Sequence, residues 1–595
     1  MATALEKDSV AQQLEHGSAC SHYDTHHDEL AARGFAADSQ DFPKGYFTSA
    51  YFLGSMIAVG FNLMASTGGF ALVAPILNQI NAAVGPSESI TWLSLVYTIC
   101  LAVGLLTVGS LSDIFGRRWF FIGGTALGVI GCIVSATGDS VPILVGGETL
   151  IGLSACTGYS YAFVSGELVP VKYRFLANAI IFIFSLPTAG FGAAVSTAFI
   201  LYTEASWRWV YYFLLILNAV TCALYFFFYQ PPTLQDKHGK GHAWGLIKNF
   251  DYVGLILFIA GLVLFILGLS SGGSLYPWKD VHTVSWIVIG CLLIVALLLW
   301  ETYAPLKEPL LPMHFFRNGG YMFSALSLGL GASTYYSQAI VFPGLISTVY
   351  ANGRLMWAGW ASCLVGIAVT IGEMIGGGLA ERLGKLKYQC IAVMTAATLF
   401  LGLMGFSTIT SSGLAMGLVF MGTFFVGWNE ALVLPICSIV VPNQKEIGRA
   451  IGAAGSMRSV VSTVASTIYS VVLTNRLTST IRDDVPQALL KAGLPASSVN
   501  QYMAKVAGGS KDFSGIAGVT EEVEVAGSLA YRHAYLDAYH TIFYVSIAFS
   551  SLAAICNILV PNIDHLMSNA VAAKLHEGRK TDGVRRKEDI ERGAN

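Results

Sequence analysis

Long apolar segments recur along almost the whole sequence and constrain the fold more than any other feature. A helix needs roughly 20 mostly apolar residues to cross about 30 Å of hydrocarbon, and a backbone in lipid has to satisfy its own hydrogen bonds. Fourteen segments meet this requirement, at about 50–74, 90–111, 119–137, 141–164, 176–201, 209–229, 252–270, 284–301, 321–343, 357–380, 388–407, 413–436, 448–473 and 540–560. We therefore predict an all-α membrane protein with fourteen transmembrane helices.

The composition fits a chain that is surrounded by lipid rather than by water. Apolar residues make up 54% of the 595 residues and charged residues only 12%, and the mean hydropathy is +0.61. No soluble core could hide that much apolar surface. Nearly all of the ten cysteines lie within apolar segments, which argues against a disulfide framework. Basic residues are scattered over short loops, so nucleic acid is not an expected partner.

Lysine and arginine are distributed unevenly between alternate loops, and this bias sets the orientation of the helices. With both termini in the cytoplasm, the internal loops on that side carry fourteen basic residues. The short loops on the other side carry only Arg208, Lys279 and Arg354. We therefore expect a multi-pass protein with two cytoplasmic termini.

Three segments outside the spans follow from this orientation. The N-terminal tail (1–48) is polar and we expect it to be disordered in the cytoplasm, and the basic C-terminal tail (561–595) is cytoplasmic as well. The long segment 475–537 then lies outside as an extracellular loop. Its mixed apolar and polar residues predict short amphipathic helices at 485–494 and 498–506. It is either a surface excursion or a cap over the outer mouth.

A short loop pattern, G-x-L-x-[acid]-x-x-G-[basic], occurs after the second span and again after the tenth. Glycine lets two helices approach closely and turn tightly, and an acid at a helix end can pair with basic groups across a moving seam. Two copies eight spans apart on the same side of the membrane indicate an internal repeat. The residues that we expect to form this gating loop are Gly109, Asp113, Gly116, Arg117, Arg118, Glu381, Arg382 and Gly384.

The repeated loop resembles the signature loop of the major facilitator superfamily, which lies between the second and third spans. Copies that are eight spans apart imply two pseudo-symmetric six-helix bundles with two inserted helices, the layout of the fourteen-span drug:proton antiporters. We therefore expect an N-terminal bundle at 49–230, a linker with two extra helices at 231–310 and a C-terminal bundle at 311–560. The first copy departs from the signature of the superfamily at Ile114, where that signature usually has a basic residue. The ion pair of this loop is therefore expected to be weaker.

Five further motifs are spread from the start of the sixth span to the segment just before the ninth. They read S-W-R-W-V-Y-Y from 206, Y-Q-P-P-T from 229, D-Y-V-G from 251, G-G-S-L-Y-P-W from 272 and P-L-L-P-M-H-F-F from 309. Together they resemble the fungal trichothecene-efflux-pump-like family, whose members export fungal toxins and which is related to the siderophore-iron transporters. The resemblance implies proton-driven transport of a small molecule across the plasma membrane. We expect a monomer with no cofactor, driven by the proton gradient.

Transport coupled to a proton gradient needs a titratable group that water reaches alternately from each side. Glu148, Glu373 and Glu430 lie within apolar spans and are the candidates for proton coupling. Arg458, the only basic residue deep in a span, is a candidate counter-ion or substrate clamp. The alternative for these groups is a static buried salt bridge or a side chain that reaches the membrane interface.

Two positions depart from the general antiporter motifs. The fourth-span motif of the superfamily has an arginine where Glu148 stands, with Gly152 matching. Arginine does not realistically deprotonate, whereas glutamate does. The fifth span keeps Pro187, but Leu186 replaces the usual glycine before it. Both departures leave open whether the proton path is that of the general antiporters. The loss of the glycine before Pro187 also weakens the argument for export.

A substrate cavity is expected near the midplane between the two halves. Aromatic and amide side chains in the spans would suit a bulky amphipathic ligand through stacking and a few hydrogen bonds. Many aromatic residues must instead belong to the interfacial belts. The cavity candidates are Tyr159, Tyr161, Tyr335, Tyr336, Gln338, Trp428, Asn429 and Arg458.

These observations favour a secondary active transporter. The leading hypothesis is proton-coupled efflux of a toxin, drug or secondary metabolite, and the close alternative is a proton-coupled siderophore-iron importer. A receptor with a transporter fold is a third reading, which the short tails disfavour. The sequence has no G-x-x-x-x-G-K-[ST] stretch and no H-E-x-x-H or G-x-S-x-G motif, so neither an ATP-driven pump nor an enzyme is expected.

Overall fold

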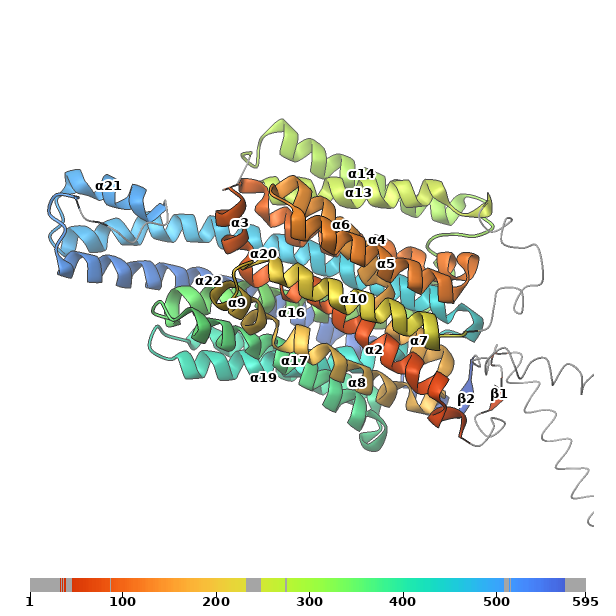
Figure 1. Cartoon of the computed structure of the whole chain (residues 1–595). Coiled ribbons are helices and arrows are strands. Elements are labelled where there is room, and N and C mark those ends of the chain that lie inside the picture. Colours follow the sequence, from red (N-terminus) through yellow and green to blue (C-terminus); the bar gives the residue numbers. More distant parts are fainter. Residues whose placement is uncertain are drawn as a thin grey trace, which may run out of the picture.

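The computed structural model describes residues 33, 35, 37–38, 45–85, 87–231, 248–272, 276–507, 513 and 515–572, apart from the side chains of residues 88, 110, 113–115 and 445. Long helices run side by side along one direction (Figure 1). At one end, strand β1 (Ala37–Asp38) pairs with strand β2 (Ala570–Val571), and we call this end the terminal face. The other end is called the opposite face.

Fourteen helical spans coincide in position with the fourteen predicted segments. Thirteen spans among the described residues are long and apolar enough to cross a membrane. The remaining span, α16, has 27 residues and is less apolar because it buries Ser327, Ser333 and Thr334 inside the protein. The spans are α2 (Ala50–Ala71), α4 (Trp92–Phe115), α5 (Arg117–Thr137), α6 (Val141–Tyr159), α8 (Arg174–Ser185) with α9 (Gly192–Tyr202), α10 (Arg208–Phe228), α13 (Tyr252–Ser271), α14 (Val281–Tyr303), α16 (Gly319–Leu345), α17 (Leu355–Leu383), α18 (Leu386–Gly402), α19 (Ser412–Ile439), α20 (Ile447–Lys491) and α22 (Glu521–Leu559). The predicted all-α membrane fold is confirmed.

Short helices and turns connect these spans. The α-helices are α3 (Leu77–Val84), α7 (Tyr161–Leu168), α15 (Met313–Arg317) and α21 (Ala496–Ala507). Two π-helical turns, η6 (Leu186–Gly190) and η7 (Ile346–Tyr350), interrupt the fifth span and end the ninth. The 3-10 turns are η2 (Tyr46–Thr48), η3 (Ala74–Ile76), η4 (Glu88–Thr91), η5 (Val171–Tyr173), η8 (Leu403–Phe406), η9 (Gln444–Glu446) and η10 (Asp564–Leu566).

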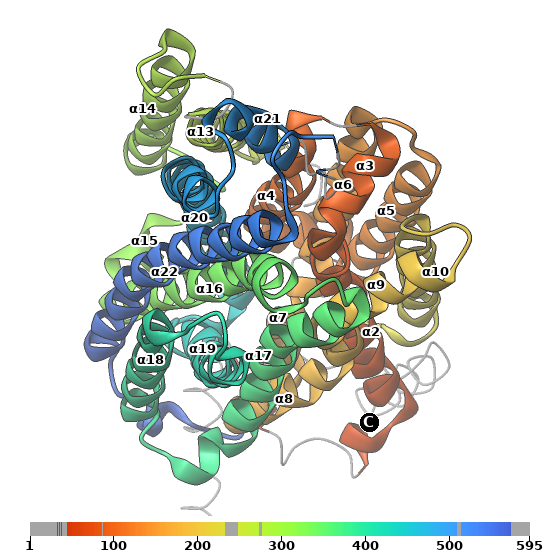
Figure 2. The same cartoon turned by 90° about the vertical axis from the view of Figure 1, so that its left-hand side faces the viewer.

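The spans form two six-helix bundles with a helical hairpin beside them. One bundle contains α2, α4, α5, α6, α8 with α9, and α10, and the other contains α16 to α20 and α22. The hairpin of α13 and α14 lies at the edge of the molecule in Figure 2, where α13 contacts both α4 and α20. The most apolar stretch of α14 is only 17% buried, so this helix faces lipid. The predicted pair of inserted helices therefore lies across the boundary between the bundles.

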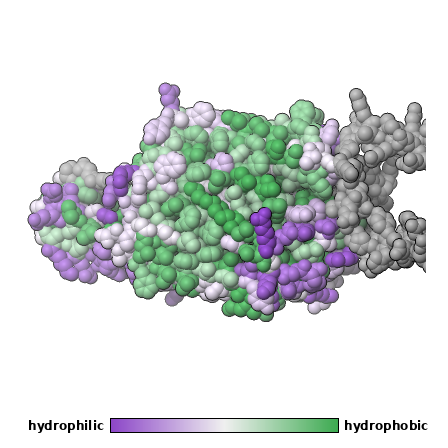
Figure 3. All heavy atoms as spheres, turned by 90° about the horizontal axis from the view of Figure 1, so that it is seen from below, coloured by the Kyte–Doolittle hydropathy of each residue, from purple (hydrophilic) through white to green (hydrophobic). Residues whose placement is uncertain are grey.

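The surface has a broad hydrophobic middle, as expected for a protein in a bilayer. Figure 3 shows hydrophobic residues over the central part of the molecule and hydrophilic residues on the projection at its left. Exposed side chains in the middle include Ile180, Ile216 and Leu292. Lipid tails rather than water cover such a surface at the lowest free energy.

The projection at the opposite face differs from the loop that the sequence led us to expect. Helix α20 has 45 residues and α22 has 39, so both continue well beyond the roughly 30 Å of hydrocarbon. Most of 475–537 is therefore helical: the expected helix at 498–506 lies within α21, whereas most of 485–494 is the end of α20. Apolar side chains that recur every three or four residues stabilise this extension, because they bury a small core of its own that includes Val485, Leu489, Tyr502 and Val523.

The described residues of the N-terminal tail are folded, whereas the sequence predicted a disordered segment at 1–48. Phe35 and Tyr46 are buried at the terminal face, and β1 pairs with β2 of the C-terminal tail. Residues 1–32 and 573–595 lie outside the described residues. Sequence patterns missed this packing because apolar and polar residues are mixed in 31–48, and no apolar run there is long enough to predict a helix or a span.

Glycines let the two bundles approach closely along two seams. On one seam, α17 packs against α8, η6 and α9, and a Cβ on Gly366 would clash with the carbonyl oxygen of Ala189. On the other seam, α4 packs against α20, and a Cβ on Gly109 would lie 2.8 Å from the backbone nitrogen of Arg449. Gly109 of the predicted gating loop therefore serves close packing between the bundles.

The Gly366→Val variant is expected to lose most of its transport activity, because the added side chain forces α17 away from the carbonyl of Ala189. Overpacking of this kind costs about 1–3 kcal/mol or more in a tight contact. Transport and thermal unfolding of the purified protein measure the effect. Gly378→Val on the same helix is the control, since nothing lies within 4 Å of its added Cβ. Equal activity of the two variants would contradict close packing at this seam.

Candidate functional site

Three charged side chains meet in the interior of the second bundle. Arg458 of α20 forms a salt bridge of 2.8 Å with Glu430 of α19, and Glu373 of α17 lines the same small cavity. All three residues are at least nine-tenths buried. Because the cluster holds two carboxyl groups and one guanidinium, its charges balance only when one carboxyl is protonated or another cation is present.

Four tyrosines surround this cluster and come from both bundles. Tyr159 and Tyr161 belong to the first bundle, and Tyr335 and Tyr336 to α16 of the second. The Arg458 guanidinium lies 5.7 Å from the centroid of the Tyr159 ring. The cavity has a volume of about 40 Å³, which is space for a water molecule or two but not for an organic substrate. In this conformation the centre is nearly closed.

A much larger hollow, the vestibule, lies on the side of the opposite face. Its volume is about 660 Å³, within the usual range for small-molecule sites, and its walls come from both bundles. Its polar groups are amides and hydroxyls, including Asn78, Gln79, Ser362 and Ser470, and none of the described residues that line it is charged. A narrow cavity that touches both Ala74 of the vestibule and Tyr335 of the cluster lies between them. A path therefore leads from the opposite face toward the charged cluster.

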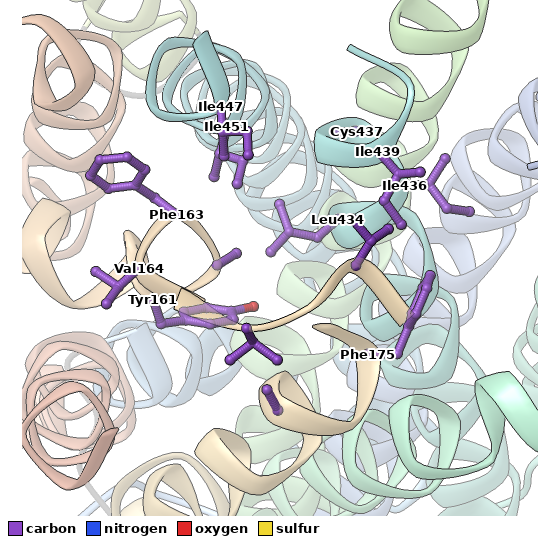
Figure 4. Packing of buried hydrophobic residues seen from close by; sticks show 14 of the residues in the cluster. Tyr161, Phe163, Val164, Phe175, Leu434, Ile436, Cys437, Ile439, Ile447 and Ile451 are labelled. Atoms are coloured by element: carbon purple, nitrogen blue, oxygen red, sulfur yellow. The ribbon is translucent and has the colours of Figure 1, made fainter. Parts of the chain in front are cut away.

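An apolar plug closes this path on the side of the terminal face. Figure 4 shows Tyr161 and Phe163 of α7 near Ile447 and Ile451 of α20, with Leu434 of α19 beside them. All of these residues are at most 5% exposed. The molecule therefore has a closed terminal side and a hollowed opposite side, as alternating access requires of one of its states.

Comparison with known proteins decides the family. The model of the family described as fungal trichothecene efflux pump (TRI12) matches residues 16–592. The chain belongs to this family. It is 26% identical over 569 residues to the trichothecene efflux pump TRI12 of Trichoderma arundinaceum, covering 93% of this chain and 94% of that protein. It is also 30% identical to the MFS-type transporter prx5 of Penicillium rubens, over 74% of this chain and 80% of the relative.

A solved structure shows the fold of this TRI12-family chain. The proton:xylose symporter XylE of the major facilitator superfamily matches with a TM-score of 0.51 and 14% identity, over 87% of this chain and 98% of that chain. At this identity the likeness establishes the fold alone. The family model and the MFS-type transporter prx5 confirm the predicted resemblance to the major facilitator superfamily.

Polar contacts surround the apolar plug of the TRI12-family protein at the terminal face. Arg117 of the first gating loop forms a buried salt bridge with Glu167 of α7. Glu381 of the second loop forms a salt bridge of 3.1 Å with Lys172, and this contact joins the two bundles. The side chain of Asp113 lies outside the described part of the structure.

The other predicted loop residues contribute to the turns or lie at the surface. Gly116 and Gly384 have positive φ angles of 80° and 57°, which explains the need for glycine at both turns. Arg118 donates a hydrogen bond of 2.5 Å to the carbonyl of Phe226, within the first bundle. Arg382 is exposed.

A further contact between the bundles involves Arg174, which the sequence did not single out. The guanidinium is fully buried and donates hydrogen bonds to Ser438 at 3.3 Å and to Gln444 at 3.1 and 3.2 Å. Arg174 belongs to α8 of the first bundle, whereas both acceptors belong to the second. In the sequence, Arg174 lies in a predicted cytoplasmic loop near the end of a span. That position indicated only how the helices are oriented in the membrane.

The two tails bridge the bundles at the same face. The backbone N–H of Gln444, in the second bundle, donates to the carbonyl of Arg33 in the N-terminal tail at 2.9 Å. The backbone N–H of Lys172, in the first bundle, donates to the carbonyl of Ser568 in the C-terminal tail at 2.9 Å. The pairing of β1 with β2, in which Ala37 lies opposite Val571, completes the bridge.

Linking the tails is expected to arrest transport with the terminal face closed. In the Ala37→Cys/Val571→Cys double variant, directly opposed strand residues are close enough for oxidative cross-linking. Transport should stop on oxidation and return on reduction. The two single variants control for the native cysteines. Undiminished transport by fully cross-linked protein would show that the bridge persists while the terminal face opens.

Four predicted site residues lie outside the central cavity. Glu148 is buried within the first bundle, where neither carboxyl oxygen has a hydrogen-bond partner among the described residues and Tyr211 lies beside it. Asn429 accepts a hydrogen bond of 2.8 Å from Asn557, within the second bundle. Gln338 is fully buried and donates to Ser337, and Trp428 lies beside Gly376 of α17. The structure thus brings together Glu373, Glu430, Arg458 and the four tyrosines.

Proposed function

We propose that this protein is a proton-coupled exporter of an uncharged, amphipathic small molecule. The single observation that carries the proposal is the path between the two bundles, which opens at the opposite face and ends at the cluster of Glu373, Glu430 and Arg458. Relatives named as efflux pumps support the direction of transport. The path lies within one chain, so a monomer suffices.

The basic loops support the orientation that we propose. Their lysine and arginine residues favour a terminal face in the cytoplasm. The opposite face then lies outside the cell in our proposal, which sets the protein in the plasma membrane. The substrate then enters from the cytoplasm when the apolar plug opens, and leaves through the vestibule in the conformation described here. Fluorescence microscopy of the tagged protein, with protease accessibility of the tags in intact cells, tests both location and orientation.

The lining of the vestibule indicates the chemistry of the substrate. Hydroxyl and amide groups alternate with aliphatic side chains, and the described lining has no charge that would favour an ionic ligand. A hydroxylated, largely apolar molecule such as a toxin or other secondary metabolite meets these conditions. Its polar groups would find hydrogen-bond partners while its apolar surface leaves water.

The charged cluster supports proton coupling. Arg458 is paired with Glu430, whereas no salt bridge joins it to Glu373 among the described residues, and Glu373 lines the cavity. A proton that arrives through the vestibule would neutralise Glu373, and opening of the terminal side would release it to the cytoplasm. Glu430 and Arg458 stay paired and hold the local charge in place.

Siderophore-iron import is the second candidate, and the named relatives do not favour it. Deletion of the gene in its native fungus distinguishes the two. Lower tolerance to toxins and higher intracellular accumulation support export, whereas poor growth on siderophore-bound iron supports import. Purified protein in liposomes should move substrate only when a pH difference is imposed. Pumping without a gradient would overturn proton coupling.

A further inference from the structure

A second hollow lies on the lipid side of α20, next to the vestibule. Its volume is about 470 Å³, and it is bounded by the end of α13, by α20 and by the start of the membrane part of α22. Leu269, Trp278, Ile468 and Val472 give it an apolar lining, with Thr541 of α22 at its edge. We call it the side pocket.

The side pocket and the vestibule meet along one stripe of α20. Thr467, Val471 and Asn475 line both hollows, and their spacing of four residues places them on one face of the helix. Ser470 lines only the vestibule and Val472 only the side pocket. The two hollows are therefore neighbours that adjoin along one helix.

The side pocket lies at the level of the membrane boundary on the opposite face. It reaches Leu269 near the end of α13, and Trp278 in the turn after that helix belongs to a residue type that favours this boundary. Its remaining wall carries Asn475 and Arg476, and Arg476 forms a salt bridge of 2.7 Å with Asp537. An apolar floor with a polar rim suits an uncharged amphipathic molecule at the lipid–water interface.

The inserted hairpin explains why this opening lies beside the vestibule. Helix α13 contacts α4 and α20, so it borders the boundary between the two bundles, and Ser270 and Gly272 at its end line the vestibule. Figure 2 shows α13 between α14 and α20, viewed toward the opposite face. Lipid faces α14, whereas α13 forms a wall of both hollows.

We propose that the side pocket is a lateral exit, through which the transported molecule passes between α13 and α20 into the outer leaflet. The inference rests on the proposed function, because it needs an uncharged amphipathic substrate that leaves by the vestibule. The side pocket adjoins the vestibule along the shared stripe of α20. This position supports the transported molecule, rather than a resident lipid, as the occupant of the side pocket. The extra hairpin then serves to border this exit.

The test compares tryptophan substitutions that differ only in where the bulk is added. Val472→Trp fills the side pocket, whereas Val295→Trp adds the same bulk to the exposed surface of α14. Efflux of the neutral, membrane-soluble dye Nile red is measured in cells that express each variant at equal levels. We expect loss of efflux in Val472→Trp and unchanged efflux in Val295→Trp.

Photolabelling in lipid nanodiscs measures whether a molecule occupies the side pocket, independently of transport. Neutral benzophenone should label the peptide containing residues 467–479 in a saturable manner, and Val472→Trp should abolish this labelling. Normal Nile red efflux by Val472→Trp would overturn the lateral exit but leave the proposed function intact. Labelling by a photoactivatable phosphatidylcholine that Nile red does not displace would assign the pocket to lipid and overturn the exit. Absence of efflux by the unaltered protein would overturn the proposed function itself.

Discussion

The Glu373→Gln variant is expected to lose transport driven by a pH difference while it remains folded and inserted in the membrane. Glutamine keeps the size and the hydrogen-bonding capacity of a protonated carboxyl, but it neither releases nor accepts the coupling proton. Glu373 lines the cavity beside the Glu430–Arg458 pair, so this change acts on the group that the path reaches. Uptake or efflux in proteoliposomes, with and without an imposed pH difference, measures the effect.

Glu148→Gln is the matched comparison, because it makes the same chemical change at another buried acid. Glu148 lies outside the cavities described above, and among the described residues neither of its carboxyl oxygens has an ion-pair or hydrogen-bond partner, so we expect its carboxyl to be protonated already. Gradient-driven transport by Glu148→Gln should therefore be close to that of the unaltered protein. Intact coupling in Glu373→Gln together with lost coupling in Glu148→Gln would transfer the proton-carrying role to the first bundle.

The Arg458→Met variant is expected to be strongly destabilised, by about 3–5 kcal/mol, because it leaves a buried carboxylate without its partner. Glu430 is 2.8 Å from Arg458, and both side chains are almost completely buried. The Glu430→Gln/Arg458→Met double variant removes both charges and should recover part of this loss. Thermal unfolding of the purified proteins in one detergent gives the coupling between the two substitutions.

Arg476→Met provides the control for loss of an arginine as such. Arg476 forms a salt bridge of the same kind with Asp537 at 2.7 Å, but both side chains are about half exposed. Solvent screens such a pair, so its loss should cost less than about 1 kcal/mol. Similar destabilisation by Arg458→Met and Arg476→Met would mean that water enters the central cluster freely.

The charged residues of the central cluster could be identified from the sequence, but their meeting in one cavity could not. Glu373, Glu430 and Arg458 stand out because charges are rare in apolar spans. Glu148 stands out for the same reason, and no local signal separates it from the others. The structure separates them, since α6 turns Glu148 into its own bundle whereas α17, α19 and α20 turn their charges toward one cavity.

Contacts made by backbone groups could be predicted from the sequence even less. The bridge between the tails depends on carbonyl and N–H groups of Arg33, Lys172, Gln444 and Ser568, which every residue type carries. The extension at the opposite face depends on whether helices α20 and α22 stay paired beyond the membrane. Hydropathy windows detect the lipid boundary, but not the pairing of helices in water beyond it.

The sequence by itself indicated the membrane class, the fourteen apolar segments and the repeated loop, and the family resemblance added the inserted hairpin. The membrane class, the apolar segments and the repeated loop follow from hydropathy and spacing along the chain, because lipid acts on each segment separately. Only the tertiary structure decided which acids meet Arg458, which tyrosines enclose them and which side of the path is closed. Each residue turns a helix by about 100°, so these contacts depend on the rotation and register of helices far apart in the chain. Packing between the two bundles sets that register.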